Sequence, residues 1–244
     1  MKQESGMPLD ADAIHAARRR IAAYVRHTPL ELSPALAARL GCTSYLKLEG
    51  MQLTGSFKPR ISFNKLLSLP EEVRRRGAVA STAGGHGIGL SFVGQQLGIP
   101  VTICLPHSAD ARKVAVIERQ GAVIRRFDSV EQSRIAALEI AAREGLTFVS
   151  AYNDPAVVAG GGTVGLEILD DAPDVDLVVV GLGGGGIAAG MAIAMKAANP
   201  KLQIWGVQPT TTAVLAAWLE AGRPVPFPEG TSIADGLGAR IEED

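Results

Sequence analysis

A lysine at the start of a predicted helix is the first residue of this sequence that could carry chemistry. Lys58 lies in the segment TGSFKPR (54–60). Pro59 favours the first turn of a helix because its ring presets φ, so we expect Lys58 at the N-terminus of a helix that runs to about Leu69. The positive end of a helix disfavours a protonated amine, and burial acts in the same direction, which makes the amine a better nucleophile. On its own, a lysine before a helix is also typical of an ordinary solvated charge.

A run of glycines marks the second candidate site. The segment GLGGGGI (181–187) follows a predicted buried strand and precedes a predicted helix, Ala188 to Ala198. Residues without a Cβ let backbone N–H groups close on an anion at a helix N-terminus, and a simple turn does not need four successive glycines. The dinucleotide pattern GxGxxG is also present, but it requires an acidic residue about 20 positions later, where this chain has Gln208. We therefore predict a phosphate site that does not bind NAD, and such a loop makes Lys58 a candidate to hold pyridoxal phosphate as a Schiff base.

A third segment, STAGGHG (81–87), follows the predicted strand 78–80 and consists mostly of small residues. Free N–H groups at the start of a helix can form a second anion cradle there. Within this segment His86 is either a structural or capping histidine or a part of the site, and the sequence leaves both possibilities open. We expect the other histidines at the surface or in a turn, without a metal triad: His15, His27 and His107.

Short β-rich runs alternate with helical patterns along most of the chain, which favours βαβ units and an α/β fold. The predicted strands are 78–80, 101–105, 123–127, 147–150, 177–181 and 203–207. The strand LVVVG is apolar throughout, which is typical of a parallel strand covered on both faces. Three glycine-rich segments lie just before or inside predicted helices, where open α/β folds bind ligands: 84–89, 160–165 and 181–190.

Capping residues predict the ends of two further helices. Ser129 and Gln132 fit a capping box at the start of a helix that ends at Gly145. Ser108 is predicted to cap another helix, which stops at Gly121.

Composition excludes several classes of protein. With 244 residues, 47% hydrophobic and 20% charged, the chain is neither disordered nor collagenous. A net charge of −1 lacks the basic excess that nucleic acid or anionic lipid demands, and no run approaches the roughly 18 apolar residues of a membrane span. The polar start does not resemble a signal peptide, and Cys42 and Cys104 are too far apart to suggest a zinc site or a disulfide framework. We expect a soluble, cytoplasmic protein without nucleic-acid or membrane partners.

The order of these motifs resembles that of fold-type II pyridoxal-phosphate enzymes, specifically the threonine/serine dehydratase group. TGSFKPR, STAGGHG, GGGTVGLEIL and GLGGGGIAAG follow one another, and the likeness extends from 26–30 to 234–236. The resemblance implies a two-lobed α/β fold like that of the tryptophan synthase β chain, with open, mostly parallel sheets covered by helices. It implies a small domain at 71–149, a large domain at 1–70 and 150–244, and further elements after residue 244.

Carried over residue by residue, the resemblance gives each motif a role. Lys58 matches the Schiff-base lysine. The residues that match the phosphate loop are Gly183, Gly184, Gly185, Gly186 and Ile187. The residues that match the loop for the substrate α-carboxylate are Ser81, Thr82, Ala83, Gly84 and His86, and Gly85 within it adjoins the cofactor ring.

Four features that differ from relatives of this family bear on function. Gly85 stands where the family usually has an Asn that contacts the ring hydroxyl. Ala83 stands where racemases of this fold commonly have a serine, which disfavours racemisation. Ile61 and Ser62 replace the usual Gly-Ala after Arg60 and are expected to narrow or reshape the wall beside the lysine. The hydroxyl residue that faces the pyridine nitrogen in relatives has no match before Asp244.

The resemblance therefore implies β-elimination of a hydroxy amino acid such as threonine or serine, giving a 2-oxo acid and ammonia. Pyridoxal phosphate is the expected cofactor, an amino acid the expected small-molecule partner, and a homodimer or homotetramer the expected assembly. A β-replacement, another β-elimination on a substituted amino acid, or a catalytically silent cofactor-binding homologue remain alternatives. The β-replacement branch usually has a threonine-rich phosphate loop in place of the four glycines, which ranks it lower.

Overall fold

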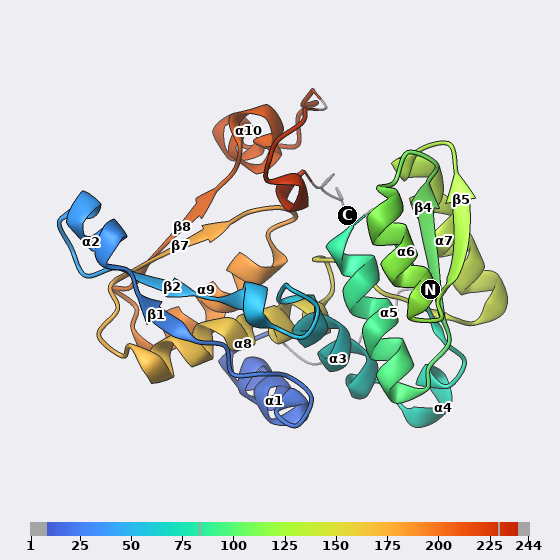
Figure 1. The fold of residues 1–244 in the computed structure, drawn as a ribbon, viewed down its shortest axis with the longest axis horizontal. Coiled ribbons are helices and arrows are strands. Elements are labelled where there is room, and N and C mark those ends of the chain that lie inside the picture. The colour runs from blue at the N-terminus through green and yellow to red at the C-terminus, as the bar shows by residue number, and fades with distance from the viewer. Residues whose placement is uncertain (1–8, 83, 229, 239–244) are drawn as a thin grey trace.

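The computed structural model describes residues 9–82, 84–228 and 230–238, and it has the predicted α/β architecture (Figure 1). Up to residue 81 its elements are α1 (Ala11–Ile21), β1 (Leu30–Leu32), α2 (Pro34–Leu40), β2 (Tyr45–Lys47), η1 (Glu49–Met51), α3 (Lys58–Ser68), α4 (Glu71–Arg74) and β3 (Ala78–Ser81). The next are α5 (Gly85–Leu97), β4 (Val101–Pro106), α6 (Ala111–Arg119), β5 (Val123–Phe127), α7 (Val130–Glu144), β6 (Thr147–Phe148) and α8 (Pro155–Asp171). The last are β7 (Leu177–Gly181), α9 (Gly186–Ala198), β8 (Gln203–Val207), η2 (Thr210–Thr212), α10 (Val214–Ala221) and η3 (Asp235–Leu237).

A four-stranded parallel sheet in the order β5-β4-β3-β6 lies in the right-hand part of Figure 1. Successive side chains of a strand point to opposite faces. Ala80 and Ile103 therefore lie in one core cluster with side chains of α5 and α6. Val79 and Cys104 point the other way and pack against α7. Both faces of this sheet are covered, as the sequence predicts for parallel strands.

Helix α8 lies between α3 and α9, and its glycines allow the close approach. A Cβ added to Gly160 would lie 2.8 Å from the Arg60 carbonyl oxygen on α3. A Cβ added to Gly162 would lie 2.7 Å from the Gly190 carbonyl oxygen on α9. The glycines of the segment 160–165 thus serve helix packing, and its place at a ligand site stays a prediction.

The second parallel sheet consists of β7 and β8. Val178 packs inward against a cluster that contains Met191 and Met195 of α9. On the opposite face Val179 and Trp205 are paired across the strands, and each is 56% exposed. The prediction that LVVVG is covered on both faces is thus wrong for the described residues, where helices pack on one face only.

The two helix caps predicted from the sequence, Ser129 and Ser108, differ in how they compare with the structure. The Ser129 cap of α7 is confirmed, since Ser129 Oγ accepts a hydrogen bond of 3.1 Å from the Gln132 amide. The reciprocal bond of a capping box is displaced by one residue, because the Gln132 side chain accepts from the Asp128 amide at 3.2 Å. The Ser108 cap is wrong, because α6 begins at Ala111 and its cap is Asp110, whose carboxylate accepts from the Arg112 amide at 2.8 Å. A carboxylate directly before the first helical turn competes better for this amide than a hydroxyl two residues earlier.

Three further boundaries differ from the predictions. Strand β6 ends at Phe148 rather than at residue 150. Helix α9 begins at Gly186 rather than Ala188. The antiparallel pair β1 and β2 is not predicted by the sequence, since each strand is only three residues long and mostly exposed.

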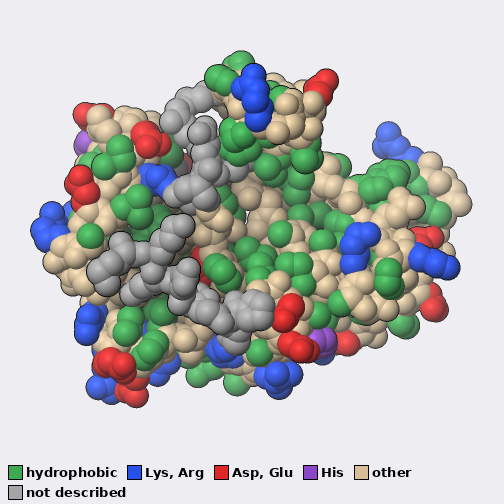
Figure 2. Space-filling view, turned by 180° about the vertical axis from the view of Figure 1, so that it is seen from behind, with side chains coloured by type: hydrophobic (Ala, Val, Ile, Leu, Met, Phe, Trp, Pro, Cys, Tyr) green, Lys and Arg blue, Asp and Glu red, His purple; other side chains and the backbone are tan. Residues whose placement is uncertain are grey.

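The surface seen in Figure 2 carries acidic and basic side chains of both signs around its periphery, whereas apolar side chains gather toward its middle. None of the described helices is long and apolar enough to cross a membrane.

Candidate active site

Lys58 begins α3 directly before Pro59, as predicted. Its Nζ has one long hydrogen bond of 3.5 Å, to the Ala151 carbonyl oxygen, and lies 4.6 Å from the centroid of the Phe57 ring. Among the described residues no carboxylate forms an ion pair with it. Burial lowers the pKa of Lys58 from 10.5 to about 8, so a substantial neutral fraction is available near physiological pH. A neutral amine is what a nucleophile or a proton acceptor requires.

Gly89 of α5 allows two helices to meet at this lysine. A Cβ on Gly89 would lie 2.6 Å from the Cβ of Lys58. This glycine therefore lets α5 cover the start of α3 and desolvate the amine. Gly89 belongs to the glycine-rich segment 84–89, but the sequence pattern does not indicate its contact with Lys58.

The small-residue loop, residues 81–87, lies at the carboxyl end of β3 and the start of α5. Within it the Gly84 amide donates to Thr82 Oγ1 at 3.2 Å, and the Gly87 amide donates to the Gly84 carbonyl at 3.0 Å. Gly85 has a φ that other residues adopt and open space where a Cβ would lie. Ala83 lies outside the described residues.

His86 of this loop is buried next to Lys58. Its Nε2 lies 3.1 Å from the Val149 carbonyl oxygen, which can only accept, so this nitrogen carries the proton. Burial, reinforced by the charge of Lys58 and opposed by the bond to Val149, lowers the pKa of His86 to about 3. Its Nδ1 is buried without a hydrogen-bond partner in the described part of the chain. His86 is thus a neutral imidazole with one free acceptor atom beside the lysine.

The glycine loop, residues 183–186, leads from β7 into α9. Gly185 has a φ of +85°, which favours glycine. A Cβ on Gly184 would lie 2.2 Å from the Tyr152 ring, and one on Gly186 would lie 2.6 Å from the Tyr152 carbonyl oxygen. The Ile187 side chain packs against a core cluster, and a Cβ on Gly161 of α8 would lie 3.2 Å from its Cα.

A short stretch of chain that the sequence did not predict as part of the site connects Lys58, His86 and the glycine loop. This linking segment, residues 149–152, follows β6. It accepts from His86 through Val149 and from Lys58 through Ala151, and Tyr152 packs on the glycine loop. The structure therefore brings Lys58, His86 and the glycine loop around one short segment. A strand that ends in small and polar residues, SAYN, is the only sequence signal for it.

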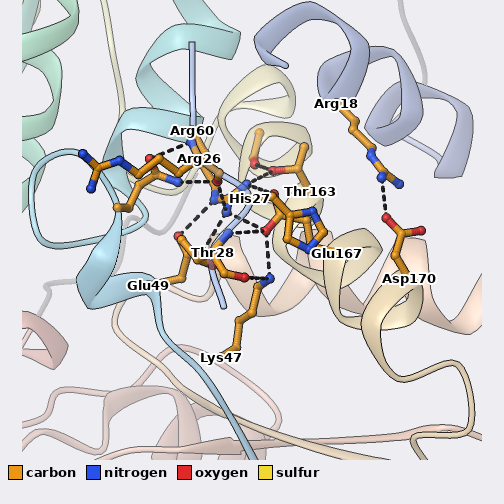
Figure 3. Close-up of polar contacts among 12 residues, drawn as sticks. Arg18, Arg26, His27, Thr28, Lys47, Glu49, Arg60, Thr163, Glu167 and Asp170 are labelled. Carbon is orange, nitrogen blue, oxygen red and sulfur yellow. Dashed lines mark hydrogen bonds and ion pairs between the residues drawn. The ribbon is translucent and has the colours of Figure 1, made fainter. Parts of the chain in front are cut away.

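A buried ion network anchors α3 two residues after Lys58 (Figure 3). Arg60 is 1% exposed and donates to both oxygens of Glu49, at 2.9 and 2.8 Å, and to both oxygens of Glu167, at 2.6 and 2.8 Å. Lys47 Nζ lies 2.8 Å from Glu167, and Thr28 Oγ1 donates to Glu49 at 2.6 Å. Burial would raise the pKa of Glu167, but the hydrogen bonds and charges of Arg60 and Lys47 lower it. Local sequence patterns gave no signal for this network.

The residues after Arg60 have a mixed outcome. Ile61 is 1% exposed and belongs to the main core cluster with Phe63 and Leu66. Ser62 is fully buried, and its Oγ has no hydrogen-bond partner among the described residues. Their expected effect on the wall beside the lysine stays a prediction.

Comparison with known proteins now adds to this geometry. The family model described as pyridoxal-phosphate dependent enzyme matches residues 21–244. The chain belongs to this family. Its site fits the cofactor of that family. Lys58 offers an amine of lowered pKa with no carboxylate partner among the described residues, and the segment 149–152 connects it to a glycine loop at the start of a helix, where a phosphate binds well.

Individual members of the pyridoxal-phosphate family are similar over nearly all of the chain. The L-threonine ammonia-lyase of Thermotoga maritima is 40% identical over 232 residues, which are 95% of this chain and 58% of that protein. The structure of maize serine racemase has a TM-score of 0.92 at 32% identity and covers 96% of this chain and 71% of that one. The structure of the processed threonine deaminase isoform 2 from Solanum lycopersicum has a TM-score of 0.85 at 30% identity, with 94% and 65% covered. The fold is therefore that of a fold-type II pyridoxal-phosphate enzyme, and the chain spans less than two thirds of the Thermotoga relative.

Proposed function

We propose that this chain carries the site of an ammonia-lyase that converts threonine or serine into a 2-oxo acid and ammonia. The observation that carries the proposal is Lys58, a buried amine with a pKa of about 8 and no carboxylate partner among the described residues, linked through residues 149–152 to the glycine loop. Relatives named threonine ammonia-lyase and threonine deaminase support the choice of reaction.

Lys58 and the glycine loop would hold the cofactor. The Lys58 amine would bind its aldehyde carbon covalently, and the N–H groups at residues 183–187 would receive its phosphate at the N-terminus of α9. When bound, pyridoxal phosphate supplies an electron sink for the negative charge that develops at the substrate Cα.

The chain's own groups would then move one proton and orient the substrate. When its amine is free, Lys58 would act as the base that takes the Cα proton, since burial lowers its pKa to about 8. The small-residue loop, including Ser81, Thr82, Gly84 and His86, would bind the α-carboxylate through its N–H groups. The β-hydroxyl would receive the proton that Lys58 took from Cα and leave as water. The unsaturated amine would then take up water to give the 2-oxo acid and ammonia.

The neutral state of His86 favours this arrangement. A protonated imidazole beside Lys58 would repel an ammonium, whereas a neutral one leaves the lysine free to accept a proton. Its Nδ1, an acceptor without a partner in the described residues, offers a hydrogen bond to a ligand group in the site.

The test is the absorption spectrum of the purified protein before and after addition of serine or threonine, together with an assay for the 2-oxo acid. We expect a visible band that changes with either amino acid and a 2-oxo acid that accumulates. A band that changes without product would favour the silent cofactor-binding homologue, for which the unusual Gly85 is the supporting observation. Product from other β-substituted amino acids alone would favour the alternative eliminations or a β-replacement.

We also propose the coarser features that the resemblance implies. Residues 71–149 would form the small domain, since the four-stranded sheet has core clusters on both faces, and 1–70 with 150–244 would form the large one.

A cytoplasmic location accords with the balanced charge and unpaired cysteines. A homodimer or homotetramer is proposed from the resemblance, and size-exclusion chromatography with light scattering tests it.

A further inference from the structure

A second lysine lies at the edge of the small-residue loop. Lys113, on α6, places its Nζ 3.9 Å from the position that a Cβ on Gly84 would occupy. Its side chain is 29% exposed. Neither the motif order nor the residue-by-residue resemblance assigns this lysine a role, yet it lies beside the loop proposed to bind the substrate carboxylate.

The partner of Lys113 comes from the far end of the described chain. Its Nζ donates to the carboxylate of Asp235 in η3, 122 positions later. The hydrogen bond and charge of Lys113 lower the pKa of Asp235. Leu237 fixes this segment near the end of β7, since a Cβ on Gly181 would lie 3.2 Å from its Cδ1. The ion pair therefore spans from the small-residue loop to the strand that leads into the glycine loop.

The ion pair between Lys113 and Asp235 is suited to exchange of one carboxylate partner for another. The Asp235 side chain is 70% exposed, and exposed ion pairs contribute little stability. A lysine has three donors that can rotate toward a new acceptor. The other charges of this corner, Asp110 and Arg112, bind each other at 2.7 Å. Lys113 is thus the cation here that an arriving carboxylate can recruit.

We propose that Lys113 is a specificity-determining residue that donates a hydrogen bond to the α-carboxylate of the substrate, with Asp235 as its partner when substrate is absent. The proposal rests on the proposed function of the small-residue loop. It makes Asp235 a competitor of the substrate rather than a ligand of it. The two residues of one ion pair then have opposite effects on substrate affinity.

The test is a titration of the cofactor-loaded protein with L-alanine, monitored through the absorption spectrum of the protein. L-Alanine has the amine and the carboxylate but no β-leaving group, so its Kd is measured without turnover. We expect Lys113→Gln to raise this Kd about tenfold through loss of a charge-assisted hydrogen bond, and Asp235→Asn to lower it. Arg112→Gln is the matched control, because it removes the same charge one residue away, and it leaves the Kd unchanged.

L-Alaninamide separates carboxylate recognition from structural damage. It lacks the anionic carboxylate, so Lys113→Gln should leave its Kd unchanged. A structural tie between the two segments would instead move both variants in the same direction, or change the affinities for alanine and alaninamide alike, and either result overturns the proposal. If the unsubstituted protein holds cofactor but ignores L-alanine, both proposals fail; if it binds L-alanine and Lys113→Gln equals Arg112→Gln, only the role of Lys113 fails.

Discussion

Lys58 and Arg60 are two cations on the first turn of α3, and their surroundings are opposite. Arg60 is enclosed by two carboxylates, which outweigh burial and raise its pKa. Lys58 has a carbonyl at 3.5 Å and no described carboxylate, so burial alone lowers its pKa. A buried charge is stable only when it is paired. Within the first turn of α3, an ion network thus holds Arg60, whereas the Lys58 amine has no carboxylate partner in the described part of the chain.

The largest expected effect is that of substituting Lys58. Lys58→Ala should abolish turnover and the adduct that borohydride traps, because no other described amine occupies its place. Folding should be retained, since the variant removes an uncompensated buried cation. Mass spectrometry after borohydride reduction and circular dichroism measure both. A reducible adduct that persists in the variant would contradict the assignment.

Substitution of the paired cation, Arg60, should instead affect the stability of the fold. Arg60→Met leaves Glu49 and Glu167 without their shared cation, so we expect the free energy of unfolding to fall by about 3–5 kcal/mol. Urea unfolding followed by circular dichroism gives this value. Arg112→Met, which breaks an exposed pair, is the control and should cost at most ~1 kcal/mol. Equal effects of the two substitutions would show that the network does not anchor α3.

Two glycines extend the same contrast between chemistry and packing. Gly184→Asp puts a side chain against Tyr152 and a negative charge in the glycine loop, so cofactor affinity should collapse. Gly160→Ala crowds the Arg60 carbonyl and should lower the free energy of unfolding by about 1–3 kcal/mol. Cofactor titration and urea unfolding of both variants distinguish the roles. Cofactor binding by Gly184→Asp that matches the unsubstituted protein would reduce that loop to a turn.

The lowered pKa of Lys58 predicts how stability depends on pH without cofactor. Between about pH 8 and 10.5 the unfolded chain keeps the Lys58 proton while the folded chain has released it. The unfolded state therefore binds more protons, and the free energy of unfolding should rise with pH through this window. Relative to the unsubstituted protein, Lys58→Met should lack this rise. Urea unfolding of both at pH 7.5 and 10 is the measurement, and parallel changes would place the amine in solvent.

The smallest expected effect concerns Gly85. Its φ suits other residues and a Cβ there meets nothing, so Gly85→Asn should be accepted without strain. An added hydrogen bond to the cofactor, worth roughly 0.5–1.5 kcal/mol, should tighten cofactor binding several-fold and shift preference toward smaller hydroxy amino acids. Cofactor titration and a substrate series decide it. An unchanged affinity and range would mean that another group already fills this role.

Neighbouring residues alone were sufficient for much of the fold and the core of the site. Local sequence signals predict three features: the strands from β3 to β8, the Ser129 cap, and the place of Lys58 at the start of a helix. They do so because caps, turns and hydrophobic periodicity act over a few residues. The Ser108 cap failed within the same range, since Asp110 lies closer to the first turn of α6.

Contacts between distant parts of the chain decided the rest. Two glycine-rich segments look alike in the sequence, yet the glycines of 160–165 lie between packed helices and those of 183–186 lie against Tyr152, because only the fold sets what approaches each of them. Glu49 and Glu167 join Arg60 from 11 and 107 positions away, and Asp235 reaches Lys113 from 122. The sequence determined that Lys58 stands at the start of a helix, directly before a proline. The tertiary structure decided that this amine is desolvated and has no carboxylate partner among the described residues, because burial and counter-ions depend on residues that meet only after folding.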